Sequence, residues 1–150
     1  MARNLGIEKC TGEFLTFIDA DDWVHPDFLR ILIDASKKNG SDITFCEYEP
    51  FYNISQLDQT VIDEGTIKLI ELCGKYGSHT FDYVMQLGLG TSPCNKVFRT
   101  DVLKKHQIHF DINTTFGEDM FFNWKVFLVS RNVYYVKKSL YGYRQNIEGA

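Results

Sequence analysis

A short apolar run that ends abruptly in carboxylates constrains this chain more than any other feature. Residues 13–18 are dense in apolar side chains, and Asp19, Asp21 and Asp22 follow at once. Such a run, apolar on both faces, indicates a buried strand. In open α/β sheets, ligands bind just beyond the carboxyl ends of the strands, which is where these aspartates stand. The pattern therefore predicts an α/β fold with a polar site at the end of this strand.

The residues after the aspartates predict a helix and then a second strand. Pro26 suits the first turn of a helix, two lysines in the last turn suit the helix dipole, and Gly40 can close the helix. Residues 42–48 indicate the second strand. Residues 13–48 are thus expected to form a strand–helix–strand unit, the building block of a parallel sheet. The apolar residues at helical spacing between the strands are Phe28, Ile31, Leu32 and Ala35.

Weaker patterns cover the rest of the chain, which is expected to form one domain over residues 1–150. Thr100 or Asp101 is expected to cap a short helix. In the helix that follows later, Phe121, Trp124 and Leu128 share one face. The expected helices are 65–73, 80–88, 100–105 and 118–130, the expected strands are 95–99, 133–136 and 139–144, and a loop is expected at 88–93.

Composition and charge argue against several classes of protein. The chain has 150 residues, 44% hydrophobic and 24% charged, as globular proteins do. A net charge of -4 without a basic stripe gives no support to nucleic-acid binding, and no apolar run approaches the roughly 20 residues that span a bilayer. Four scattered cysteines fit free thiols in a reducing cytosol, and the four histidines are interpreted as non-ligands. The aromatic share of 15% favours a core rich in rings over rings that line a sugar or nucleotide site.

The three aspartates raise the question of what neutralises them. Adjacent carboxylates repel one another, so the cluster is costly unless a positive charge lies nearby. Mg²⁺ and Mn²⁺ prefer oxygen ligands and take one or two carboxylates together with substrate phosphates. The alternative is a solvated turn in which one aspartate caps the next helix, because aspartate is common in turns. Spacing alone leaves both interpretations open.

Blocks along the chain resemble family-2 glycosyltransferases of the GT-A fold. The first blocks are residues 2–7, 11–15 and 17–22, which read Ala-Arg-Asn-Leu-Gly-Ile, Thr-Gly-Glu-Phe-Leu and Phe-Ile-Asp-Ala-Asp-Asp. Residues 95–99, 117–119 and 140–144 follow in the family's order, and residues 49–90 match poorly. The resemblance implies a GT-A-like (Rossmann-like) α/β fold, with a mostly parallel or mixed sheet flanked by helices.

The same resemblance implies an enzyme and its substrates. Such an enzyme transfers a sugar from a nucleotide-sugar, expected to be a UDP-sugar, to a carbohydrate acceptor such as a glycan or lipid-linked glycan. Mn²⁺ or Mg²⁺ is the expected cofactor, and one base acting opposite the leaving group implies inversion at the anomeric carbon. An enzyme of polysaccharide biosynthesis is expected in the cytoplasm or at the inner face of the membrane.

The resemblance also assigns roles to individual residues. Asp19 and Asp21 match the Asp-x-Asp motif, in which one carboxylate contacts the ribose and the second coordinates the metal. Asp22 is a third expected metal ligand. Arg3 matches an arginine that lies near the nucleotide, and Asp119 matches the general base.

Three further residues remain open between a functional and a structural role. Arg144 could reach a phosphate or lie on the surface beside a strand. Trp23 could stack on a sugar or anchor the following helix. Glu118, like Asp119 on sequence alone, is well explained by helix capping, and the resemblance reverses that for Asp119 only.

Met1 stands immediately before the first matching block, so the domain is expected to be N-terminally truncated. The strand at 13–18 would then have a bare edge, which favours self-association into a homo-oligomer. A truncated remnant that folds or associates without turnover is the main alternative to an active enzyme. A nucleotidyltransferase is a further alternative, since such enzymes also place aspartates at strand ends.

Overall fold

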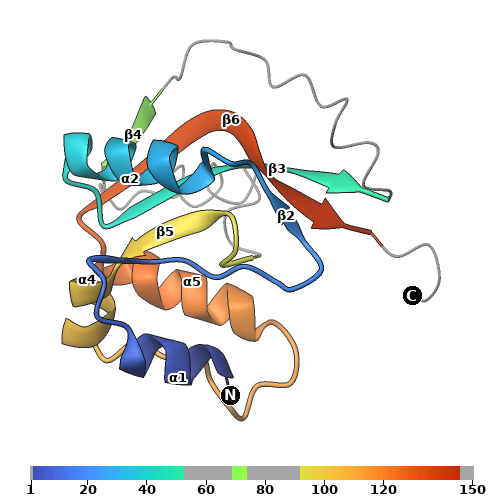
Figure 1. The fold of residues 1–150 in the computed structure, drawn as a ribbon. Coiled ribbons are helices and arrows are strands. Elements are labelled where there is room, and N and C mark those ends of the chain that lie inside the picture. Colours follow the sequence, from blue (N-terminus) through green and yellow to red (C-terminus); the bar gives the residue numbers. More distant parts are fainter. Residues whose placement is uncertain (1, 53–68, 74–91, 146–150) are drawn as a thin grey trace.

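The computed structural model describes residues 2–52, 69–73 and 92–145, with residues 69–73 as backbone only (Figure 1). Within these ranges the helices are α1 (Ala2–Lys9), α2 (Phe28–Asn39), α4 (Thr100–Lys105) and α5 (Glu118–Val129). The strands there are β1 (Phe14–Leu15), β2 (Trp23–Val24), β3 (Ile43–Phe51), β4 (Leu69–Cys73), β5 (Lys96–Arg99) and β6 (Asn132–Arg144).

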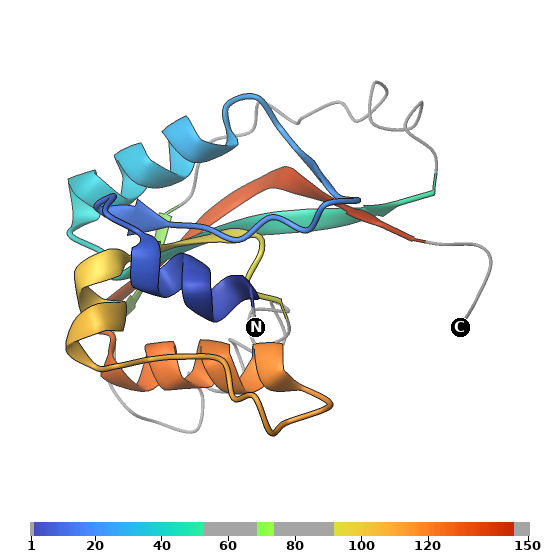
Figure 2. The same cartoon turned by 60° about the horizontal axis from the view of Figure 1, so that its bottom comes forward.

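The described strands form one mixed sheet between two layers of helices. The strand order is β1-β5-β3-β6-β2, and β4 also pairs with β6. β3 and β6 are parallel, and the other pairs are antiparallel. α2 covers one face of the sheet, and α4 and α5 lie on the other, with α1 beside α4 (Figure 1, Figure 2). This is the mixed form of the predicted α/β sheet flanked by helices.

The strand expected at 13–18 is present at the edge of the sheet, but only Phe14 and Leu15 pair through the backbone, with β5. After Leu15 the Thr16 hydroxyl donates to the carbonyl of Lys96 (2.6 Å), so a side-chain hydrogen bond takes the place of backbone pairing with β5. β1 and β3 are each antiparallel to β5, which lies between them. The predicted strand–helix–strand unit is therefore present with β5 inserted between its strands.

α2 forms where its sequence pattern predicts it, and its end is well defined. Its buried residues are those at the predicted helical spacing, with Ser36 added. Gly40 adopts a left-handed conformation (φ 58°), and its N–H donates to the carbonyl of Ser36. A side chain in that conformation would be strained, so glycine suits the position.

Several expected elements differ from the structure. Residues 69–73, at the end of an expected helix, form strand β4. Arg99, and not Thr100 or Asp101, takes the N-cap position of α4. Residues 2–9, for which no element was expected, form helix α1. The helix expected at 80–88 lies outside the described residues.

The two strands expected at 133–136 and 139–144 are one continuous strand, β6. Its register with β3 shifts around Glu47, between Cys46 and Tyr48. Such an irregularity interrupts the strict alternation of apolar residues on which strand prediction depends. The polar pair Lys137 and Lys138 in the middle of the strand therefore resembles a break in the sequence without ending the strand.

The apolar face of α5 that the sequence pattern picks out is not the face that is buried. Phe121 and Leu128 are 49% and 62% exposed, whereas Phe122 and Val126 are fully buried. Apolar residues surround this helix on most sides, so their spacing could not identify the inner face. Which face of α5 is buried depends instead on the aromatic cluster in which Phe122 packs.

That cluster consists of Phe17, Phe98, Phe110 and Phe122. The rings of Phe110 and Phe122 stack with centroids 4.0 Å apart, and Phe17 packs edge-on against both. The prediction that most rings build the core is therefore confirmed for these residues. Since Phe17 precedes Asp19 by two positions and Phe122 follows Asp119 by three, the same core fixes the backbone that carries both carboxylates. Within the described ranges, no helix is both long and apolar enough to cross a membrane.

Candidate active site

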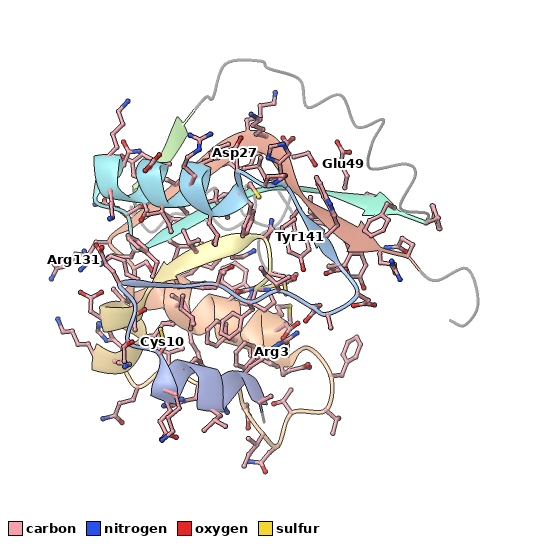
Figure 3. The ribbon with its side chains drawn as sticks, viewed as in Figure 1. Arg3, Cys10, Asp27, Glu49, Arg131 and Tyr141 are labelled. Atoms are coloured by element: carbon pink, nitrogen blue, oxygen red, sulfur yellow. The ribbon has the colours of Figure 1, made fainter. Side chains whose placement is uncertain are left out.

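Arg3 joins two carboxylates that are far apart in the sequence. Its Nη2 donates to Oδ1 of Asp19 (2.8 Å), and its Nη1 donates to Oδ1 of Asp119. The three side chains are 29%, 39% and 26% exposed. The residue predicted near the nucleotide, Arg3, is labelled in Figure 3. Its two ion pairs place it between a predicted metal ligand and the predicted base.

The position of Arg3 follows from how α1 is held. Asn4 donates to the carbonyl of Phe110 (2.9 Å) and accepts from its N–H (2.8 Å), which ties the first turn of α1 to the segment before α5. The guanidinium of Arg3 lies over the Phe110 ring, 5.4 Å from its centroid. Because this ring belongs to the aromatic cluster, the core also orients the arginine.

Asp119 stands in the first turn of α5, where the helix dipole favours a carboxylate. Gly117 occupies the N-cap with a φ of 79°, and no side chain caps the helix. Asp119 is therefore used to pair with Arg3, not for capping. Burial raises the pKa of Asp119, and the positive charge of Arg3 offsets only part of this effect. A carboxyl group with a raised pKa is a stronger base once it is ionised.

The turn after β1 separates the three predicted metal ligands. The Asp22 N–H donates to the carbonyl of Asp19 (3.1 Å), which closes the turn. The two oxygens of the Asp22 side chain accept from the Tyr141 hydroxyl (2.5 Å) and from the Arg144 N–H (2.9 Å). Asp21 is exposed. Asp19 thus faces Arg3, Asp21 faces solvent, and Asp22 accepts hydrogen bonds from β6.

Tyr141 links this turn to the sheet. Besides its bond to Asp22, the hydroxyl accepts from the N–H of Asp19 (3.4 Å). Burial and the hydrogen bond to Asp22 raise the pKa of Tyr141, so the hydroxyl stays protonated and donates to Asp22. The turn that carries the aspartates is therefore fixed by a tyrosine from the far end of the chain.

A cavity of about 300 Å³ lies against these residues. Asp19 and Asp119 both line it, so the structure brings the first predicted ligand and the predicted base to one cleft. The other lining residues are Tyr48, Ser92, Asn95, Tyr141 and Tyr143. A larger hollow of about 670 Å³ lies between residues 106–112 and α5 and contains none of the predicted site residues. The smaller cavity is therefore the candidate active site.

The donor set suits a hard divalent cation only in part. Within the described ranges, no group of three or more histidine, cysteine, aspartate or glutamate side chains is arranged to hold a metal. Both oxygens of the Asp22 side chain already accept hydrogen bonds. Asp19 and Asp21 remain, and one or two carboxylates with substrate phosphates are a common ligand set for Mg²⁺. The residues therefore fit a cation that a phosphorylated substrate would help to bind.

Arg144 and Trp23 lie outside the lining of this cavity. The Arg144 guanidinium stacks over the ring of Phe51, 5.7 Å from its centroid. Trp23, in β2, is half-buried and contacts the ring of His25. The phosphate contact expected of Arg144 and the sugar contact considered for Trp23 stay predictions.

Sequence reasoning missed several residues of the cavity wall. Tyr48, Asn95 and Tyr141 line it, and none was assigned to the site. Asn95 and Tyr141 both lie in blocks that carry the family resemblance, which was an available indication. Tyr48 follows the irregular register of β3, and no local pattern predicts that.

A mixed sheet with helices on both faces defines an α/β protein, and in such folds ligands commonly bind beyond the carboxyl ends of the strands, where Asp19 follows β1 here. Residues 1–107 match the profile described as Glycosyl transferase family 2, and the chain belongs to this family.

Curated relatives and a solved structure agree with this assignment. Glycosyltransferase GlyA of Streptococcus pneumoniae is 30% identical over 154 residues, which cover 95% of this chain and 20% of GlyA. The solved structure of Staphylococcus aureus TarS 1–349 in complex with UDP-GlcNAc superposes with a TM-score of 0.72 and 21% identity, covering 99% of this chain and 39% of that one. The predicted GT-A-like fold is confirmed. The chain spans between 20% and 41% of the length of the curated relatives it matches.

Proposed function

We propose that this chain forms the catalytic part of an inverting glycosyltransferase that uses a UDP-sugar and a divalent cation. The observation that carries the proposal is the Arg3 bridge, which holds Asp19 and Asp119 on the wall of one cavity. The family assignment supports glycosyl transfer, and the UDP-GlcNAc bound to TarS supports a UDP-linked donor. The acceptor is proposed to be a hydroxyl of a glycan or lipid-linked glycan.

Asp119 would act as the general base in this reaction. It would take the proton of the acceptor hydroxyl while that oxygen forms a bond to the anomeric carbon of the donor. The bond from this carbon to the diphosphate breaks at the same time, and UDP leaves with the electron pair. One displacement of this kind inverts the anomeric centre.

Asp19 and Asp21 would hold Mn²⁺ or Mg²⁺ together with the donor diphosphate. A bound cation supplies Lewis-acid stabilisation of the charge that grows on the leaving group. Asp22, whose oxygens are both engaged by β6, would fix the turn and not bind the cation directly. Arg3 would exchange part of its contact with the carboxylates for the nucleotide, since all three side chains are accessible to water.

The proposal is tested by incubating the purified chain with UDP-GlcNAc and other UDP-sugars, with Mn²⁺ or with EDTA, and measuring released UDP. UDP release that requires the cation supports the proposal. Calorimetry with UDP and Mn²⁺ separates the alternatives, because a non-catalytic remnant is expected to show no metal-dependent UDP binding. Release of pyrophosphate in place of UDP would indicate a nucleotidyltransferase, and failure to bind UDP would contradict the proposal.

A further inference from the structure

Lys96, the first residue of β5, is a lysine buried beside the candidate site. It is fully buried, and its Nζ donates to Oδ1 of Asn95 (2.6 Å). In the part of the chain that the structure describes, no carboxylate lies within ion-pair distance of it. Burial lowers the pKa of Lys96 to about 7, although nearby thiols and Asp119 favour the charged form. Burying an ammonium in this way is costly, which points to a role beyond packing.

The partner of Lys96 is an amide whose orientation is fixed. Asn95 Nδ2 donates to the carbonyl of Cys46 (2.5 Å), and that carbonyl can only accept. Lys96 Nζ on the other side donates to the amide oxygen, and in its charged form it can only donate. A flipped amide would place oxygen against oxygen at Cys46. The two neighbours therefore determine which end of the Asn95 side chain carries the N–H groups.

The backbone around the amide is equally constrained. The Cys46 N–H donates to the carbonyl of Asn95 (3.0 Å), so main chain and side chain of Asn95 both bind one residue of β3. This clamp lies where the register of β3 begins to shift. Asn95 is only 3% exposed, yet it lines the cavity with Asp19 and Asp119. A polar group that is buried, held by two hydrogen-bond partners and part of a cavity wall is suited to position a ligand atom.

Among the residues that the structure describes, one N–H group of this amide is left for a ligand. A primary amide has two N–H groups, and among the described contacts of Asn95 Nδ2 only the bond to Cys46 uses one. The second can bind only an acceptor atom. The carboxylates that line the same cavity can only accept hydrogen bonds when ionised. A ligand oxygen that needs a donor would therefore bind to the Asn95 N–H.

We propose that Asn95 donates this hydrogen bond to an oxygen of the nucleotide-sugar donor, and that Lys96 is the positioning residue that orients the amide. The inference rests on the proposed function, because it concerns the same cavity. The oxygen belongs either to a sugar hydroxyl or to the diphosphate, and both present the same acceptor chemistry. Lys96 itself need not touch the substrate.

The contact is tested by NMR of the ¹⁵N-labelled chain. The Asn95 side-chain amide is assigned by its loss in Asn95→Ser, and UDP and then UDP-GlcNAc are added in the presence of Mg²⁺. A large shift with UDP alone places the diphosphate at Asn95. A shift only with UDP-GlcNAc places a sugar hydroxyl there. Binding of both ligands without any change at this amide overturns the inference, while a chain that binds neither overturns the proposed function as well.

Variants separate the two roles in the donor-dependent assay. Asn95→Ser is expected to raise the KM for the UDP-sugar about threefold to tenfold, as loss of one hydrogen bond would. Lys96→Met is expected to give a similar rise in KM, with kcat changed less, and to alter the Asn95 amide resonance without ligand. Lys38→Met, which removes an exposed lysine of α2, is the matched control and should leave KM unchanged.

If Lys96→Met does not fold, Lys96→Arg and Asn95→Ser still test the arrangement. Arginine preserves a donor to the amide oxygen, and recovery of the wild-type KM in a folded Lys96→Arg would support positioning. A KM unchanged in Asn95→Ser, with transferase activity intact, overturns the inference and leaves the proposed function standing.

Discussion

Two groups of polar side chains lie beside one cavity and are built in opposite ways. The Arg3, Asp19 and Asp119 cluster is ionic, comes from three elements and remains between a quarter and two fifths exposed. Lys96 and Asn95 are adjacent in the sequence, almost fully buried and joined by one hydrogen bond. Charges open to water can change partners at low cost, whereas a buried pair cannot. The first cluster is therefore suited to respond to a ligand, and the second to hold its geometry.

The largest effect on activity is expected at Asp119, the proposed base in the cluster of Arg3, Asp19 and Asp119. Asp119→Asn removes the proposed base with little change in shape, and we expect transfer to fall by about 10²–10⁴-fold. Donor binding should persist, since the base contacts the acceptor. Rates of UDP release and calorimetry with UDP check the two parts. Glu118→Gln removes a charge from the same helical turn and should retain most of the activity.

Arg3→Met should separate the two carboxylates. Burial already raises the pKa of Asp119, and loss of the arginine removes the charge that opposes this rise. Asp119 must be ionised to act, so the acidic limb of the pH–activity profile should move to higher pH. Activity should fall more at low pH than at high pH. A profile that only scales down, with its acidic limb unmoved, would contradict the bridge, and Arg30→Met serves as an exposed-arginine control.

The buried pair of Lys96 and Asn95 leads to a prediction about how stability depends on pH. The pKa of Lys96 is about 7 in the folded chain and near 10.5 when unfolded, so the unfolded state binds more protons between these values. The free energy of unfolding should therefore rise as the pH increases from about 7 to 9, by up to a few kcal/mol. Lys96→Met should abolish this rise. Urea unfolding at several pH values measures it, and Lys38→Met should retain the wild-type slope.

Tyr141→Phe should have a smaller effect. It removes the hydrogen bond from the hydroxyl to Asp22, and we expect a loss of about 1–2 kcal/mol in the free energy of unfolding. The turn that carries Asp19 should loosen, so donor binding should weaken as well. Tyr143→Phe, at an exposed neighbour on β6, provides the control for stability in urea titrations. Equal stability of the two variants would show that the bond to Asp22 contributes nothing.

Self-association through the edge strand is the smallest expected effect. β1 lies at one end of the strand order, so the sequence-based prediction of an uncovered edge can be tested. We expect weak, concentration-dependent association by size-exclusion chromatography with light scattering. A monomer at high concentration would count against it.

Local patterns predicted the elements whose residues carry one consistent signal. α2 has apolar residues at one helical spacing and a glycine at its end, and it formed as expected. The inner face of α5, the continuity of β6 and the strand at β4 were not predicted, because each depends on a neighbour distant in the sequence. The bond of Asp22 to Tyr141 spans 119 positions, so no local pattern could assign the turn's carboxylates to different tasks.

The residues alone were enough to predict a buried strand that ends in carboxylates and to recognise a resemblance to one enzyme family. The contacts of Arg3 with both Asp19 and Asp119, of Asp22 with β6 and of Lys96 with the Asn95 amide became known from the folded chain. Side-chain type and spacing are local properties. The partner that satisfies a charge or an amide is chosen by packing between segments that the sequence keeps far apart.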